Sequence, residues 1–181
     1  VSFTDPDLKY TSNGGKVSKT DGTDIFFTNS ADTKLSHEIE KYDPATGQLI
    51  AWVKLPSLSS SADTTLNLYF GNASASDQQD KTGVWDTNYK GVWHLDGGTN
   101  LGINDATGSN NIASKGTFVP VDSGKIGGGV DNNGSSHMRL NGSPMDGLTS
   151  FTLDTWINHD TGASGQAFWS DWSTPQVLWR Y

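Results

Sequence analysis

Eighteen of the twenty acidic side chains in this chain are aspartates, and the only glutamates are Glu38 and Glu40. Aspartate competes with the backbone for hydrogen bonds and favours turns and caps, whereas glutamate favours helices. The chain also contains 21 glycines, and its apolar runs are short and bounded by Gly, Pro or Asn. These features predict an all-β fold with short strands, long loops and little helix.

Short alternating runs predict the strands of the first half. A hairpin is expected where the turn residues Asp43–Gly47 separate the runs 35–42 and 49–55. Up to residue 88 we expect a β-meander of about five strands, formed by the runs 1–3, 24–28, 35–42, 49–55 and 64–72.

The second half of the chain has a different amino-acid composition. From Asp96 to Gly116 it is mostly Gly, Asn, Asp, Ser and Thr, which predicts a long surface loop. The most regular strand pattern of this half is Phe151–Ile157, and we expect Trp156 to pack in the core. Further short strands are expected at 117–121, 137–140, 167–169 and 176–181.

Charge and composition exclude several classes of function. The net charge is -8, with only two arginines, which disfavours nucleic acids and anionic membranes as partners. No run of 18 apolar residues is present, so no membrane-spanning helix is expected. The chain has no cysteine, and disulfides and thiolate metal sites are therefore excluded.

Two groups of motifs resemble known families. The first comprises Asp21–Thr28, His37–Glu40, Ala51–Pro56, Leu68–Asn72 and Gly91–Leu95. It resembles a domain family of unknown function found in large secreted or surface proteins of bacteria and archaea. The second comprises Asp105–Asn111, Gly124–Gly129 and Ser150–Ile157. It is similar to the first part of a laminin-G-like module of the concanavalin A-like lectin/glucanase class, and this resemblance implies an antiparallel β-sandwich of the jelly-roll type.

The resemblance implies two modules, 1–88 and 89–181, that meet within the aromatic stretch Val84–Leu95. Few residues separate Trp85 from Trp93, so we expect the modules to abut rigidly. Members of both families usually supply more strands than this sequence does. We therefore expect the chain to be incomplete at both ends, or to be completed by another chain through strand addition.

The two glutamates are weak candidates for catalysis. Glu38 and Glu40 stand two apart on a predicted strand, which places their side chains on one face about 7 Å apart. Retaining glycosidases hold two carboxyl groups about 5 to 5.5 Å apart. A solvated or hydrogen-bonded strand face explains the same pattern, and the first family has no established catalysis.

Loop oxygens offer a possible cation site. Asp105, Asn110 and Asp131 are candidate ligands for calcium, which prefers six to eight oxygen ligands. Lectin-like modules often hold a loop calcium, so the resemblance implies a structural ion. Turn chemistry explains each of these residues equally well.

Aromatic residues near the end are candidate sugar contacts. Trp172 lies in the polar segment Ser170–Ser173, where Asp171 could bind hydroxyl groups, and Trp169 stands next to it. Exposed indole faces stack on sugar rings, although the same tryptophans could equally belong to a core.

Three functions follow from these observations. The first is a non-catalytic extracellular or cell-surface module that binds a polysaccharide or a surface glycan in adhesion. The second is a structural subunit that assembles with copies of itself by strand exchange. The third is a glycoside hydrolase that uses Glu38 and Glu40. No nucleic-acid partner, no membrane insertion and no cofactor other than calcium are expected.

Overall fold

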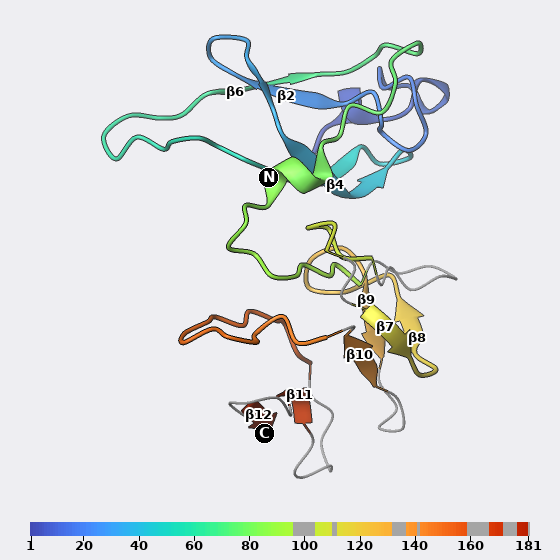
Figure 1. Ribbon diagram of the computed structural model, residues 1–181. Coiled ribbons are helices and arrows are strands. Elements are labelled where there is room, and N and C mark those ends of the chain that lie inside the picture. The colour runs from blue at the N-terminus through green and yellow to red at the C-terminus, as the bar shows by residue number, and fades with distance from the viewer. Residues whose placement is uncertain are drawn as a thin grey trace. The chain divides into compact units, whose positions relative to one another are not determined.

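The computed structural model describes residues 1–95, 104–109, 112–131, 137–140, 142–158, 167–171 and 177–180. The chain divides into two compact units, Val1–Tyr89 and Lys90–Tyr181. Strands in antiparallel sheets make up most of the regular structure of both units (Figure 1). The helical segments within the described residues are single turns, Pro6–Leu8 (η1), Thr11–Asn13 (η2) and Lys81–Val84 (α1). The predicted all-β class with little helix is confirmed. None of these helices has the length and apolarity that crossing a membrane requires.

Two three-stranded antiparallel sheets build the first unit, with strand orders β1-β5-β4 and β3-β2-β6. Their strands are Ser2–Thr4 (β1), Phe26–Asn29 (β2), Lys34–Leu35 (β3), His37–Asp43 (β4), Gln48–Val53 (β5) and Leu66–Tyr69 (β6). The predicted meander is wrong in its pairing, because β1 pairs with β5 and β2 pairs with β6. Two short sheets can close over one shared core, which a single sheet of consecutive strands cannot do alone.

The hairpin between β4 and β5 forms where the turn residues predict it. The Asp43 carboxylate accepts hydrogen bonds from the backbone N–H groups of Ala45 and Thr46 and from the Thr46 hydroxyl. The Thr46 hydroxyl is the main reason that the pKa of Asp43 lies below its ordinary value. Gly47 closes the turn with a φ of +77°, in the left-handed region that favours glycine.

The core of this unit lies between the two sheets and the N-terminal segment. Tyr42 ties this segment to β4, because its hydroxyl donates a 2.6 Å hydrogen bond to the Leu8 carbonyl. Burial raises the pKa of Tyr42 to about 12. The buried apolar side chains come from both sheets and from the loops before β2: Leu8, Val17, Ile25, Phe27, Leu35, Leu49 and Ala51.

A histidine is enclosed in this core. His37 is fully buried, and its ring meets the edge of Phe27 at a centroid distance of 5.4 Å. Its Nε2 lies 3.0 Å from the Ile25 carbonyl oxygen, and its Nδ1 lies 3.4 Å from that of Leu35. Burial, which disfavours the charged form, lowers the pKa of His37 below the ordinary 6.5.

The first unit is therefore expected to lose stability as the pH falls below 6.5. The folded state resists protonating His37, whereas the unfolded chain protonates it at its ordinary pKa, so acid favours unfolding. Urea unfolding, followed through the amide NMR signals of β4 and β5, should show this loss between about pH 6.5 and 5, before carboxylates titrate. His37 is the only histidine of Val1–Tyr89, so His37→Gln should flatten the profile in this window. If the free energy of unfolding of His37→Gln still fell with pH in the same way, a group other than His37 would be responsible.

The second unit contains three two-stranded antiparallel sheets within its described residues, β7-β10, β8-β9 and β11-β12. Their strands are Ile112–Lys115 (β7), Val119–Val121 (β8), Gly129–Asp131 (β9), Met138–Leu140 (β10), Ala167–Asp171 (β11) and Val177–Arg180 (β12). Four of them overlap predicted runs, whereas β7 lies in the segment predicted to be a loop and β9 lies where no strand was predicted. The lectin-like architecture of this half stays a prediction, as does rigid abutment of the modules.

Two predictions for this unit are wrong. Residues 151–157 form no strand, although their sequence alternates regularly. Trp156 is 68% exposed rather than packed in a core, and the Lys125 ammonium lies 5.1 Å from its ring centroid. Alternation describes how a segment would fit a sheet, but a strand also needs a partner for its backbone hydrogen bonds, and 151–157 has none assigned among the described residues.

Candidate functional site

Glu38 and Glu40 lie against a pair of indole rings. The Glu38 carboxylate accepts a 3.1 Å hydrogen bond from Trp85 Nε1, and the Glu40 carboxylate accepts one from Trp52 Nε1. The two indole rings are tilted against each other with centroids 5.4 Å apart, and the ring of Tyr89 meets Trp85 edge-on at 5.0 Å.

This arrangement fastens the segment after α1 to the outer side of the sheet β1-β5-β4. Glu38 stands directly opposite Trp52 in the β4–β5 register, and only 5% of Glu38 is exposed. A carboxylate that is buried and holds an indole N–H is poorly placed to reach a glycosidic bond. The geometry gives both glutamates a structural role, and the catalytic pair stays an untested alternative.

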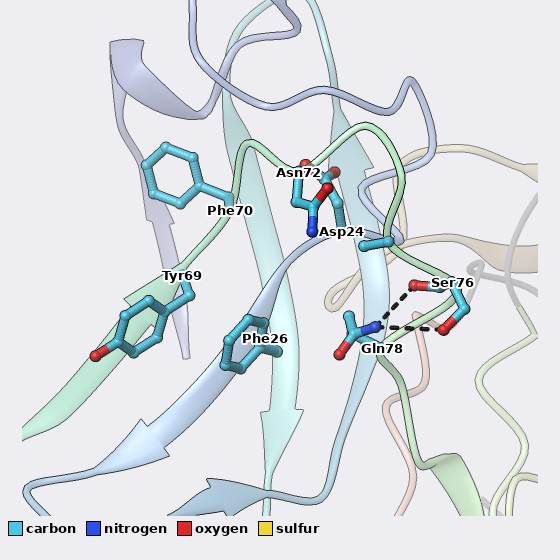
Figure 2. Close-up of a pocket in the computed structure, with 8 residues that line it drawn as sticks. Asp24, Phe26, Tyr69, Phe70, Asn72, Ser76 and Gln78 are labelled. Carbon is cyan, nitrogen blue, oxygen red and sulfur yellow. Dashed lines mark hydrogen bonds between the residues drawn. The ribbon is translucent and has the colours of Figure 1, made fainter. Parts of the chain in front are cut away.

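A pocket of about 440 Å³ opens beside the other sheet of the same unit. Its walls come from the start of β2, the end of β6 and the loop that follows β6. Figure 2 shows aromatic rings on one side of the pocket and polar groups on the other. Ligand sites commonly have this volume and this combination of apolar walls with a few fixed polar groups. The lining includes Asp24, Phe26, Tyr69, Asn72, Ser76 and Gln78.

Asp24 is the most unusual residue of this pocket. Only 1% of it is exposed, and its Oδ2 accepts hydrogen bonds from the backbone N–H groups of Ser18, at 3.0 Å, and Gly71, at 2.8 Å. Its other oxygen, Oδ1, is buried and has no hydrogen-bond partner. Buried polar atoms in native proteins are nearly always paired, and an unpaired carboxylate oxygen is costly. Asp24 Oδ1 is thus an unused acceptor that is enclosed in the wall of the pocket, where a ligand cannot reach it.

The aromatic wall is formed by neighbouring strands. Phe26 of β2 stands opposite Tyr69 of β6, and their rings stack with centroids 5.0 Å apart and planes 11° apart. The side chains alternate along β2, so Phe27 enters the core while Phe26 points outward. The Tyr69 hydroxyl donates a 2.9 Å hydrogen bond to Asp32, and this bond raises the pKa of Tyr69.

The loop after β6 supplies the polar wall. Gln78 is held by its backbone N–H, which donates to the Thr23 carbonyl, and by its side-chain amide, which donates to the Ser76 carbonyl at 2.9 Å. The side-chain oxygen of Gln78, Oε1, accepts a 2.8 Å hydrogen bond from the ammonium group of Lys34. Internal bonds also fix the loop start, where the Ser74 N–H donates to the Asn72 side chain. The pocket wall is thus hydrogen-bonded in place.

The predicted calcium ligands are not assembled by the described residues. Asp105 is buried, and its carboxylate accepts hydrogen bonds from the N–H groups of Val92 and Thr107 and from the Thr107 hydroxyl. Asp131 is exposed at the end of β9, and Asn110 lies outside the described residues. No group of three or more His, Cys, Asp or Glu side chains with metal-binding geometry occurs in the part of the chain that the structure describes. Calcium binding stays a prediction.

The predicted sugar contacts near the C-terminus are only partly placed. Trp169 and Asp171 belong to β11, where their backbones stand opposite Trp179 and Val177 of β12. Their side chains lie outside what is described, and so does the whole of Trp172. Whether these three residues bind a ligand stays a prediction.

The sequence did not single out the pocket. The pair Phe26–Phe27 was one available signal, because consecutive aromatic residues on a strand must place one ring on each face. Asp24 gave no such signal, since its unpaired oxygen depends on how the loops at 18 and 71 fold around it.

Comparison with known proteins finds a family-level similarity in the segment that contains the pocket. No curated protein and no solved structure is significantly similar to the chain. A family model does match residues 21–106, slightly less than half of the chain, and this match includes every residue that lines the pocket. In this segment the chain is similar to the family described as "Domain of unknown function (DUF2341)".

Proposed function

We propose that this chain is a non-catalytic carbohydrate-binding module of an extracellular or cell-surface protein, and that the pocket beside β2 and β6 holds the sugar. The observation that carries this proposal is the exposed ring of Tyr69, which stacks on Phe26 across from the polar loop that contains Ser76 and Gln78.

Sugars match both walls of the pocket. Their hydroxyl groups donate and accept hydrogen bonds, and the polar lining residues Asn72 and Gln78 offer side-chain amides for such bonds. Their C–H faces are apolar and stack on aromatic rings such as that of Tyr69, which is 41% exposed. Ser76 offers further polar contact from the opposite wall.

Binding without cleavage is favoured by the composition of the lining. Hydrolysis of a glycosidic bond ordinarily needs two carboxyl groups, one on each side of the bond. The lining contains one, Asp24, and its Oδ2 is occupied by two backbone N–H groups. Localisation outside the cell rests on the sequence resemblance alone.

Tyr69→Ala is expected to weaken binding while the fold is kept. The substitution removes the exposed stacking ring of the pocket wall, and Tyr69 is not one of the buried core residues. Calorimetric titration of the full chain with neutral oligosaccharides should show about a fivefold loss of affinity, the size of one aromatic contact.

Phe3→Ala is the matched control, because Phe3 is exposed to a similar extent, 39%, and lies on β1 in the other sheet. It should bind like the wild-type protein. Failure of the wild-type chain to bind any oligosaccharide of a broad panel would contradict the proposal, and so would equal affinities of the two variants.

A further inference from the structure

We infer that Lys34 determines which sugar the pocket prefers, and that the preferred ligand carries an N-acetyl group, the neutral amide of an acetylated amino sugar. This inference rests on the proposed function and names the substrate class of the same pocket. It follows from the hydrogen-bonding groups that the polar side of the pocket leaves unused.

Lys34 brings an ammonium group to the pocket from the neighbouring strand. It stands opposite Thr28 in the pairing of β2 with β3, so its side chain shares a sheet face with Phe26. Its Nζ lies 5.6 Å from the centroid of the Phe26 ring and donates to Gln78 Oε1 at 2.8 Å. An ammonium group has three N–H donors, and no carboxylate among the described residues forms an ion pair with Lys34. Because Lys34 is exposed, its remaining donors are accessible to a ligand.

The polar wall offers more donors than acceptors. Asn72 Oδ1 accepts a hydrogen bond from the Ser74 N–H, whereas Asn72 Nδ2 donates none within the part of the chain that the structure describes. The Gln78 amide is bonded at both ends, because its Oε1 accepts from Lys34 and its Nε2 donates to Ser76 (Figure 2). The second lone pair of Gln78 Oε1 remains as an acceptor. The matching ligand group therefore has a strong acceptor and one donor.

A secondary amide has both, together with an apolar end. Its carbonyl oxygen can accept from Lys34 Nζ or Asn72 Nδ2, and its N–H can donate to Gln78 Oε1. Its methyl group can lie on the ring of Tyr69, which is 41% exposed at the same pocket. A hydroxyl group also donates and accepts, but it has no apolar part to place on this ring. The N-acetyl group therefore uses both sides of the pocket at once.

Charge disfavours the two ionised alternatives. A free amine would be cationic and would approach the Lys34 ammonium group, which is already placed near Phe26. A uronic acid or sulfated sugar would approach a chain of net charge -8, with Asp24 in the pocket wall and Asp32 on the Tyr69 hydroxyl. A neutral amide avoids both repulsions and still accepts a charge-assisted hydrogen bond from an ammonium group.

Three trisaccharides test the inference on the full chain. They are the N-acetylglucosamine trisaccharide, the glucosamine trisaccharide and cellotriose, which share one linkage and differ only in an acetamido, amino or hydroxyl group on each ring. Calorimetric titration at about pH 6.5, below the ordinary pKa of about 8 for an α-amino group, keeps the free amine charged. The wild-type protein should bind the acetylated form at least about tenfold more tightly than the other two, the size of one hydrogen bond to a charged group.

Three variants test the role of Lys34. Lys34→Met removes the donors and keeps an unbranched side chain, whereas Lys34→Arg keeps the charge and the donors. Lys81→Met is the matched control, because Lys81 is exposed on α1, does not line the pocket and carries the same charge. The preference for the acetylated form over cellotriose should disappear in Lys34→Met and persist in Lys34→Arg and Lys81→Met. Affinity for cellotriose should hardly change in any of them.

Each outcome decides between the inference and the proposed function. Equal affinities of the wild-type protein for the acetylated form and cellotriose, both weakened in Tyr69→Ala, would overturn the amide preference and leave the proposed function standing. Equal or tighter binding of the free-amine form would do the same. A preference that persists in Lys34→Met, or an equal loss of all three sugars in that variant, would show that Lys34 only supports the wall and would overturn its role. Absence of binding to all three and to every other neutral sugar would overturn the proposed function and the inference together.

Discussion

Gly47→Ala is expected to lower the free energy of unfolding of the first unit by about 4 kcal/mol. Gly47 has a φ of +77°, where an L residue costs about 1 to 2 kcal/mol. An added Cβ would also overlap the carbonyl oxygen of Asp5 and stand 3.1 Å from the amide nitrogen of Lys9. Both are backbone atoms held by hydrogen bonds of η1, so neither can move away without disturbing the buried Leu8.

Gly14→Ala is the control for this substitution. Gly14 has nearly the same φ, +83°, but nothing lies within 4 Å of the position a Cβ would take. It should cost only the backbone strain of about 1 to 2 kcal/mol. Urea unfolding followed by the amide NMR signals of β4 and β5 measures both values. Equal losses in the two variants would show that contact with Asp5 has no energetic weight.

Asp24→Ala is expected to lower the free energy of unfolding by about 3 kcal/mol. Truncation leaves the buried N–H groups of Ser18 and Gly71 without an acceptor, at a cost of about 1 to 3 kcal/mol each. Relief of an unpaired buried charge offsets part of this cost.

Asp24→Asn separates the two effects. It keeps one acceptor for both N–H groups and removes the charge, so its stability should equal or exceed that of the wild-type protein. The same unfolding measurement compares the three proteins. A large loss of stability in Asp24→Asn would mean that Oδ1 is already satisfied within the folded chain.

Local chemistry made part of this fold predictable. The turn between β4 and β5 follows from Asp43, Thr46 and Gly47, whose side chains and φ angle act within five residues. The inward face of β6 follows from the alternation of Leu66 and Leu68, which both pack against the core. These features depend only on neighbours in the sequence.

Long-range pairing was not predictable in the same way. Nothing local distinguishes the observed pairing of β2 with β6 from a meander, since both satisfy the same alternation. The contact of Glu38 with Trp85 spans 47 positions, and the bond of Asp24 to Gly71 spans another 47. The aromatic wall of the pocket depends on the pairing of β2 with β6, so it could not be assembled from the sequence alone.

The attachments of the first unit's two ends have a mechanical consequence. The N-terminal ammonium group of Val1 donates to the Ala51 carbonyl at 2.7 Å, while Trp85, near the other end, packs on Trp52. Ala51 and Trp52 are consecutive residues of β5, the central strand of its sheet. A pulling force applied between the two ends of Val1–Tyr89 would therefore act on neighbouring residues of the same strand, β5. The strands around the pocket, β2 and β6, belong to the other sheet and would not carry this force directly.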